Sequence, residues 1–272
     1  MNSSDFSGTG RFGRGTAKMN RPLFSCVVPV KGARPYLEAT MDSLRSQGLG
    51  NELEVIVQDA DVEPDRGQSD ALNRGFAKAS GEWLFWLNAD DLLMSGALEK
   101  VRNAVDKCQS AGGVEWIVGN QMLIDADGRV LKCLRANGWH DFLYREAVPH
   151  VNGPSAFFRR ELLASVGGFD ETLDFCMDWD LWIRFCRAGA RFVRLDAYLW
   201  AQRQWDGSKT QRAKGADEER TQAHEVQRML AKNAFRMTKL GDILMRFWRT
   251  ANGNYLRGAW DTMRHRGKVW PS

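Results

Sequence analysis

The chain is poor in cysteine and has no long apolar run. Its 272 residues include five cysteines that form neither an even set nor a CxxC pair, so neither a disulfide framework nor a structural zinc site is expected, and a reducing cytoplasm fits best. No segment approaches the about 18–20 consecutive apolar residues of a membrane-spanning helix. Residues 1–20 are rich in Gly and Ser and lack the apolar core of a secretory signal, which predicts a flexible arm. The cysteines are Cys26, Cys108, Cys133, Cys176 and Cys186.

The composition is that of a folded chain with an uneven charge distribution. Hydrophobic residues make up 43% and charged residues 26%, which excludes wholesale disorder and fits one large domain or two small ones. The net charge is +4, yet residues 226–272 hold ten Lys or Arg against Asp242 and Asp261, a local balance of +8. Aromatic residues such as Phe247 and Trp260 are interleaved with these basic residues. The pattern fits either an interfacial helix on an anionic membrane or a helical extension packed on the body with solvated arginines.

Short apolar runs alternate with helical patterns in the first half of the chain. We expect strands over residues 23–30, 54–57 and 83–87, and helices around residues 37–44 and 71–79. Strands that alternate with helices predict an α/β sheet with right-handed crossovers. Ligands of such sheets lie outside the carboxyl ends of the strands, so the candidate site comprises residues 30–31, 59–68 and 88–91.

The second half of the chain has a less regular pattern. It predicts a hairpin over residues 116–134 and a short helix over residues 161–166. A second helix is expected to begin near Asp178 and to end at residue 189, followed by a strand over residues 191–195.

Three groups of acidic residues carry the chemical interest, and each has a structural alternative. Asp90 and Asp91 follow an apolar strand, where one carboxylate facing a diphosphate could hold Mg²⁺ or Mn²⁺, or where either residue could simply cap a helix. One of the four acids in the loop after the second strand could accept from a base imide or a ribose hydroxyl, or the whole loop could be solvated; these acids are Asp59, Asp61, Glu63 and Asp65. Asp178 precedes a tryptophan at a helix start and could be a general base or an N-cap.

Taken in order along the chain, the motifs resemble a family-2 glycosyltransferase of the GT-A fold. The likeness covers about residues 23–210, and its specificity lies in the ordered set of motifs. Those of the nucleotide-sugar half are Val27-Val28-Pro29-Val30, Glu54-Val55-Ile56-Val57-Gln58-Asp59, Asp65-Arg66-Gly67-Gln68-Ser69-Asp70-Ala71-Leu72-Asn73-Arg74-Gly75 and Asn88-Ala89-Asp90-Asp91. Those of the acceptor half are Val166-Gly167-Gly168-Phe169-Asp170-Glu171, Met177-Asp178-Trp179-Asp180-Leu181-Trp182 and Gly207-Ser208-Lys209-Thr210.

The resemblance implies a fold, a reaction and a set of site residues. The fold would be a Rossmann-like, mostly parallel sheet flanked by helices over residues 21–210, with a basic helical tail over residues 211–272. The reaction would be an inverting transfer of a sugar from a nucleoside diphosphate to a hydroxyl, with Asp178 as catalytic base and a divalent metal, Mg²⁺ or Mn²⁺, on Asp90. Nucleotide-sugar binding is carried over to Pro29, Val30, Lys31, Asp59, Asp65, Gln68, Asn73, Asn88 and Ala89, and the acceptor and diphosphate vicinity to Trp179, Arg203 and Lys209.

The chain departs from the family pattern at three positions. Asn88 stands where the family usually has the first Asp, Met177 replaces a Glu that often precedes the base, and Trp205 stands where many members have a His. The metal would therefore have fewer ligands, and the diphosphate would rely more on Lys31, Arg203 or Lys209.

Three functional classes remain open at this point. The leading one is a sugar transferase at the cytoplasmic face of a membrane, with a glycan or lipid-linked acceptor and the tail as a peripheral anchor. A nucleotidyltransferase would also need carboxylates and Mg²⁺, but Gly32 alone is a poor phosphate loop. The third class is a non-catalytic scaffold or nucleic-acid-binding protein that uses the basic tail, although no nucleic acid is expected as a partner under the leading hypothesis.

Overall fold

The computed structural model describes residues 21–32, 34–109, 113–137, 153–209, 216–234 and 238–269. The predicted flexible arm, residues 1–20, lies outside these residues. The parallel part of the sheet comprises β1 (Phe24–Val30), β2 (Leu53–Asp59) and β3 (Trp83–Trp86), with β1 between the other two. The connections contain helices α1 (Arg34–Arg45) and α2 (Gln68–Lys78) and the short 3-10 turn η1 (Gly50–Glu52), so the predicted strand-helix alternation is confirmed.

The sheet becomes mixed beyond β3. Its order is β2-β1-β3-β7-β5-β8-β4, with β6 paired to β5; β7 runs antiparallel to both of its neighbours, and β8 runs parallel to β5. The sheet as a whole is therefore mixed. The strands β2, β1 and β3 are parallel as the sequence suggested, and β5 and β8 form a second parallel pair. The added elements are β4 (Leu92–Leu93), α3 (Ala97–Gln109), β5 (Trp116–Ile124), β6 (Val130–Leu134), η2 (Gly153–Ser155), β7 (Ala156–Arg159), α5 (Arg160–Ser165), α6 (Met177–Arg187) and β8 (Phe192–Arg203).

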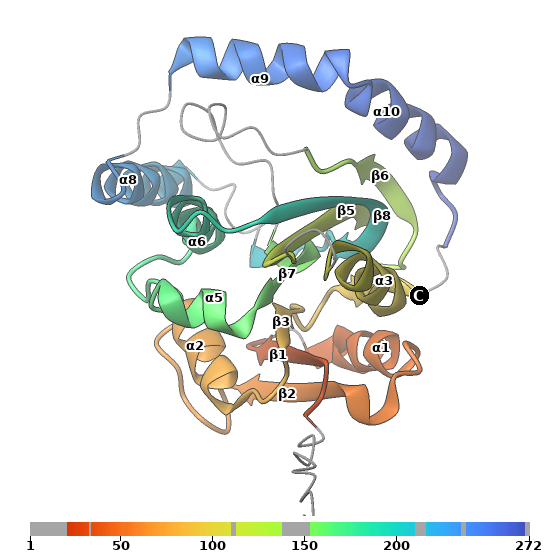
Figure 1. Cartoon of the computed structure of the whole chain (residues 1–272), viewed down its shortest axis with the longest axis vertical. Helices are drawn as coiled ribbons and strands as arrows, with labels where there is room; N and C mark the ends of the chain where they lie inside the picture. Colours follow the sequence, from red (N-terminus) through yellow and green to blue (C-terminus); the bar gives the residue numbers. More distant parts are fainter. Residues whose placement is uncertain are drawn as a thin grey trace, which may run out of the picture.

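Helices cover the curled sheet on both faces (Figure 1). Successive residues of β1 point to opposite faces, so Val28 packs with Leu44 of α1 on one face while Val27 packs with Leu72 of α2 and Leu181 of α6 on the other. Because β1 is buried on both faces, its sequence is apolar except for Ser25, whose hydroxyl donates to the Glu54 carboxylate.

The strand expected over residues 191–195 is longer than predicted. It continues as β8 to Arg203, past the charged residue Asp196. The Asp196 carboxylate accepts hydrogen bonds from Asn120 Nδ2 at 2.9 Å and Arg135 Nη1 at 2.7 Å, which compensates the charge within the strand. The extension matters because it carries Arg203 to the edge of the candidate site.

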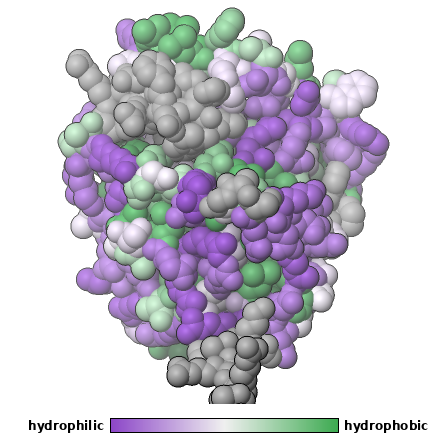
Figure 2. Space-filling model, in the orientation of Figure 1, coloured by the Kyte–Doolittle hydropathy of each residue, from purple (hydrophilic) through white to green (hydrophobic). Residues whose placement is uncertain are grey.

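The C-terminal residues form three helices, α8 (Ala216–Lys232), α9 (Lys239–Ala251) and α10 (Asn254–His265). The helix α8 packs against α6. The helix α10 lies over β6, and α9 precedes it along the outer border of the molecule (Figure 1). Figure 2 shows apolar surface, in green, at the edge where α9 lies. Among the described residues, no helix has the length and apolar content needed to cross a membrane.

Candidate active site

Parallel pairing brings the carboxyl ends of the first three strands together. Val30 lies opposite Asp59, and the Leu87 N–H donates to the Val27 carbonyl at 3.0 Å, just beyond the end of β3. Pro29 has no N–H to donate to a neighbouring strand. It lies two residues beyond Val27, the last residue of β1 that pairs with β3. Three parts of the chain therefore meet at one edge of the sheet, where the strands end. They are Lys31, which is exposed, Asp59, and residues 88–91, which are here called the Asp90 loop.

A chain of side-chain hydrogen bonds connects three predicted site residues. Lys209 Nζ donates to Gln68 Oε1 at 3.2 Å, Gln68 Nε2 donates to Asn88 Oδ1 at 2.9 Å, and Asn88 Nδ2 donates to Asp91 Oδ2 at 2.8 Å. Asn88 thus accepts on one side and donates on the other. An aspartate at position 88 would have no proton for Asp91 and would bring two carboxylates together, which gives a physical reason for the departure from the family pattern.

Asp91 is an internal hydrogen-bond acceptor, not a helix cap. Besides Asn88, its buried carboxylate accepts from the Arg203 N–H at 2.9 Å and from Trp200 Nε1 at 3.0 Å. Burial and, to a lesser extent, the charge of Asp90 raise the pKa of Asp91 well above its usual range. Asp91 therefore fastens the Asp90 loop to β8.

Asp90 has a contact that sequence reasoning did not find. Trp205 Nε1 donates to Asp90 Oδ2 at 2.8 Å, and the Trp205 ring meets Tyr36 edge-on with 5.2 Å between centroids. A Cβ atom on Gly207 would overlap the Trp205 ring, so this packing requires glycine there. The residue that stands at the family's histidine position is therefore a hydrogen-bond donor to the predicted metal ligand.

Arg203 is buried, with its guanidinium bound to main-chain carbonyls. Its Nε donates to the Asp90 carbonyl at 2.9 Å, its Nη1 donates to the carbonyls of Asp125 and Ala126, and its guanidinium carbon lies 4.5 Å from the centre of the Tyr36 ring. These contacts indicate that Arg203 holds the Asp90 loop to the β5–β6 turn, and they do not favour the expected role beside a diphosphate.

The Asp90 loop offers a divalent cation few oxygen ligands that are not already hydrogen-bonded. Among the described residues, no group of three or more His, Cys, Asp or Glu side chains could hold a metal. The Asp91 oxygens already accept three donors, and Asn88 Oδ1 accepts from Gln68. Asp90 therefore remains as one carboxylate at a strand end, which fits Mg²⁺ or Mn²⁺ held chiefly by substrate phosphates and water.

The other residues carried over to nucleotide binding have unequal surroundings. Both oxygens of Asp59 accept from Arg34 Nη2, at 3.0 and 3.1 Å, and Asp65 Oδ1 accepts from the Gly67 N–H at 3.0 Å. Ala89 is buried in the Asp90 loop. Asn73 is not part of this group, because its amide bonds to both the N–H and the carbonyl of Phe169 and so joins α2 to the loop before α6.

Asp178 lies in the first turn of α6 and is half-buried. The N-cap of α6 is Cys176, so Asp178 is not the cap that the sequence left as an alternative. Burial raises the pKa of Asp178 from its ordinary 3.8 to about 6, against the opposing effects of the Trp179 and Gly153 N–H groups and the positive charge of Lys209. A carboxyl group that titrates near neutral pH is suited to accept a proton.

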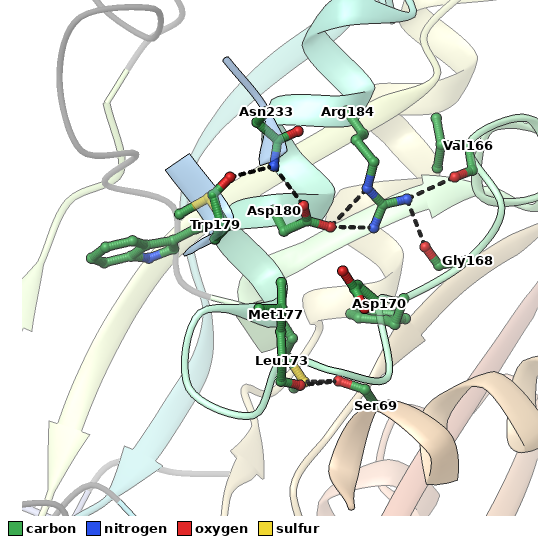
Figure 3. A network of polar contacts seen from close by, with 12 residues as sticks. Ser69, Val166, Gly168, Asp170, Leu173, Met177, Trp179, Asp180, Arg184 and Asn233 are labelled. Carbon is green, nitrogen blue, oxygen red and sulfur yellow. Dashed lines mark hydrogen bonds and ion pairs between the residues drawn. The ribbon is translucent and has the colours of Figure 1, made fainter. Parts of the chain in front are cut away.

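Two buried acids hold α6 in place, and sequence reasoning missed one of them. Asp180 pairs with Arg184 at 2.7 Å and accepts from Asn233 Nδ2 at 2.7 Å, while the Trp179 ring points away from this pair (Figure 3). Glu225 of α8 accepts from three consecutive N–H groups at the start of α6, those of residues 174–176, at 2.6–3.0 Å. The helix α8 is thereby tied to the element that carries Asp178.

Lys209 connects the two halves of the candidate site. Its ammonium donates to Gln68 on the strand-end side, and to the side chain and carbonyl of Asp174 at 2.8 and 2.5 Å, on the loop before α6. Its charge also acts on Asp178. Lys209 is thus hydrogen-bonded to Gln68 and acts through its charge on Asp178, although the three residues are far apart in the sequence.

Comparisons with known proteins identify the family of the chain. The sequence profile of the family described as "Glycosyltransferase like family 2" matches residues 40–209. An uncharacterized glycosyltransferase of Rickettsia bellii is 27% identical over 197 residues, which cover 62% of this chain and 28% of that protein. The chain spans between 28% and 60% of the length of the four Rickettsia relatives it matches.

Solved structures share the fold at low sequence identity. The mannosyltransferase PcManGT of Pyrobaculum calidifontis, in complex with GDP-Man and Mn²⁺, has a TM-score of 0.53 and 20% identity, over 78% of this chain and 64% of that one. TarS 1-349 of S. aureus, in complex with UDP-GlcNAc, has a TM-score of 0.51 and 19% identity, over 75% and 66% of the two chains. The chain therefore belongs to the glycosyltransferase-like family 2 and has the GT-A fold.

Proposed function

We propose that the enzyme transfers a sugar from a nucleoside diphosphate to a hydroxyl group of a glycan or lipid-linked acceptor, with inversion at the anomeric carbon. The observation that carries the proposal is the position of Lys209, which bonds to Gln68 beside the Asp90 loop and acts electrostatically on Asp178. Donors of this class, GDP-Man and UDP-GlcNAc, are bound in the two solved relatives.

The nucleotide sugar would bind at the carboxyl ends of β1, β2 and β3. Asp59 would contact the base or the ribose, with Arg34 beside it, while Asn88 and Ala89 would line the ribose and diphosphate. Exposed Lys31 and the ammonium of Lys209 would supply positive charge to the diphosphate. Asp90 would hold Mg²⁺ or Mn²⁺, which when bound neutralises the charge that develops on the leaving diphosphate.

Asp178 would act as the general base. Its carboxylate would take the proton of the acceptor hydroxyl while the acceptor oxygen forms a bond to the anomeric carbon and the bond to the diphosphate oxygen breaks. The proton ends on Asp178 and the electron pair on the released nucleoside diphosphate. The pKa of about 6 keeps Asp178 ionised at neutral pH and still basic enough to assist, a contribution of typically ~10²–10⁴-fold.

We also propose that the reaction takes place in the cytoplasm. The five cysteines are free in the structure, and three of them are buried, as suits a reducing compartment.

A thermal unfolding screen with nucleoside diphosphates, each with and without Mn²⁺, tests the proposal. A ligand at 100 times its dissociation constant stabilises a protein by about 2.7 kcal/mol, so one nucleotide should raise the melting temperature by several degrees, and more with Mn²⁺. Asp90→Asn should remove the Mn²⁺ increment, whereas Asp106→Asn, an exposed carboxylate on α3, should keep it. A melting temperature that no nucleotide changes would contradict the proposal.

A further inference from the structure

The two last helices expose an apolar stripe to solvent. On α9, Leu240, Ile243 and Phe247 recur at i, i+3 and i+7, and on α10, Leu256, Trp260 and Met263 recur at i, i+4 and i+7. These six residues, here called the outer stripe, are between 62 and 74% exposed. Their spacing places each set of three on one side of its helix.

The amphipathic pattern of α10 is inverted relative to an ordinary surface helix. Its inner face is polar or small: the Thr262 hydroxyl accepts from the Cys133 N–H at 2.9 Å, and the Asp261 carboxylate accepts from Arg135 and from the Tyr198 hydroxyl. Gly258 lies against the backbone of Cys133. A surface helix normally turns its apolar side to the core, whereas the apolar side of α10 has no such partner within the described part of the chain.

The charge around the outer stripe is predominantly positive. Residues 238–269 contain seven Lys or Arg against two Asp, and one of these, Asp261, is turned inward onto Arg135. Lys239 and Arg246 lie four residues before and three after Ile243. Arg257 lies three residues before Trp260, and Arg264 lies four residues after it. Exposed cations therefore adjoin the outer stripe on both helices.

We propose that the outer stripe docks on an anionic lipid surface, with α9 and α10 lying in the interface between headgroups and acyl chains. An exposed apolar face bordered by Lys and Arg is the pattern of an interfacial helix. A second copy of this chain would bring the same cations against the same face and be repelled. A nucleic acid would satisfy the cations and leave the apolar side chains in water.

The place of α9 and α10 at the outer border of the molecule is consistent with both helices lying on a lipid surface. In Figure 2 apolar atoms gather where α9 forms the outermost layer, and Figure 1 shows that α9 and α10 follow one another along the same side. In this view α9 forms the upper border of the molecule and α10 continues that border down the right-hand side (Figure 1).

Co-sedimentation of the full chain with vesicles tests the proposal. Vesicles of phosphatidylcholine alone are compared with vesicles that contain about 30 mol% phosphatidylglycerol, because each Lys or Arg near an anionic surface adds about 1 kcal/mol, roughly fivefold in partitioning. We expect strong binding to the anionic vesicles, weak binding to the neutral ones, and a decrease on raising NaCl from about 0.05 to about 0.5 M.

Matched variants separate the apolar and the charged contributions. The double variant Leu256→Gln, Trp260→Gln should reduce binding to anionic vesicles on the order of tenfold for each side chain, whereas Leu256→Met, Trp260→Phe should retain it. The double variant Arg264→Gln, Lys268→Gln should reduce binding to the anionic vesicles and leave binding to the neutral ones unchanged. The control Lys100→Gln, Lys107→Gln, on α3, should not reduce binding to either kind of vesicle. All of these positions are exposed, so the urea midpoint of each variant serves as the check on folding.

Three results would overturn the proposal. The first is no binding of the wild type to anionic vesicles, and the second is equal binding by the two Leu256/Trp260 variants. The third is a dimer in light scattering that the Gln variant dissociates, without vesicle binding, which would assign the outer stripe to self-association. The nucleotide-dependent melting shift is independent of all three, so loss of this proposal leaves the proposed sugar transfer standing, and the reverse also holds.

Discussion

Replacing Asp178 by Asn should stabilise the protein while abolishing efficient sugar transfer. The ionised carboxylate is held partly away from water, and burial raises its pKa to about 6. The same property that makes Asp178 a competent base therefore costs folding free energy at neutral pH. Asn has nearly the same shape, carries no charge, and offers a carbonyl oxygen to the Trp179 N–H that donates to Asp178 at 2.9 Å.

The size and pH dependence of the gain follow from the two pKa values. The folded-state pKa lies above the unfolded one, 3.8, so the penalty is fully present above pH 6 and is lost as the pH falls toward 4. A shift of about 2 pKa units corresponds to about 3 kcal/mol at pH 7.5. The same linkage leaves about 1.5 kcal/mol at pH 5 and about 0.5 kcal/mol at pH 4. Because Asp178 is only half-buried, solvent screening makes these values upper bounds, and we expect about 1–3 kcal/mol at pH 7.5.

Urea unfolding of the wild type and of Asp178→Asn at several pH values measures this difference directly. The stability gained by the variant should shrink steadily from pH 7.5 to pH 4, while nucleotide binding is retained. Asp106→Asn, which removes an exposed carboxylate from α3, is the control and should show no comparable pH-dependent gain. A variant that is less stable than the wild type at pH 7.5, or a difference that does not vary with pH, would refute the reasoning.

Four further predictions concern the same site. For the wild type, kcat/KM should rise with pH and reach half of its plateau near pH 6, since Asp178 must be ionised; a flat profile would exclude it as the base. Trp205→Phe removes the donor to Asp90 Oδ2 and should change the Mn²⁺ concentration needed for half-maximal nucleotide binding several-fold, leaving binding without metal unaltered; an unchanged Mn²⁺ titration would refute this role. Glu225→Gln should lower the free energy of unfolding in urea by about 1–3 kcal/mol, because three N–H groups lose a charged acceptor, and an effect below 0.5 kcal/mol would argue against it. Asn88→Asp should destabilise the protein more at pH 8 than at pH 5, because its charge would face Asp91; equal melting-temperature losses at both pH values would contradict this.

The parallel part of the fold was accessible from sequence because its signals are local. The predominantly apolar run of β1, the continuous apolar run of β3 and the helical spacing of α2 depend on burial by nearby segments, and the structure confirms all three. The length of β8 was not accessible, because the charge of Asp196 is compensated by Asn120 and Arg135, which come from other strands or their ends.

The candidate site divides in the same way. The strand-end positions of Asp59 and Asp90 follow from the order of strands and loops alone. The roles of Arg203 and Asn73 do not, because their partners are main-chain atoms of distant loops that no residue type reveals. Glu225 was missed because it lies outside every motif, in the sequence just before the basic segment, and its function depends on how α8 packs. The composition of residues 226–272 fitted either an interfacial helix or an extension packed on the body, and only the structure shows that the inner side of α10 is polar and its apolar side exposed.

The central claim is that Asp90 serves the donor and Asp178 serves the acceptor within one site. Calorimetry tests it most directly: the nucleoside diphosphate found in the melting screen is titrated, in the presence of Mn²⁺, into each of the two single variants. Sugar transfer is measured on the same samples. The account predicts that Asp90→Asn loses the Mn²⁺-dependent part of nucleotide binding, and that Asp178→Asn binds like the wild type but transfers sugar at least a hundredfold more slowly, on the order expected for loss of a general base. Normal transfer by Asp178→Asn, or unchanged Mn²⁺-dependent binding by Asp90→Asn, would contradict it.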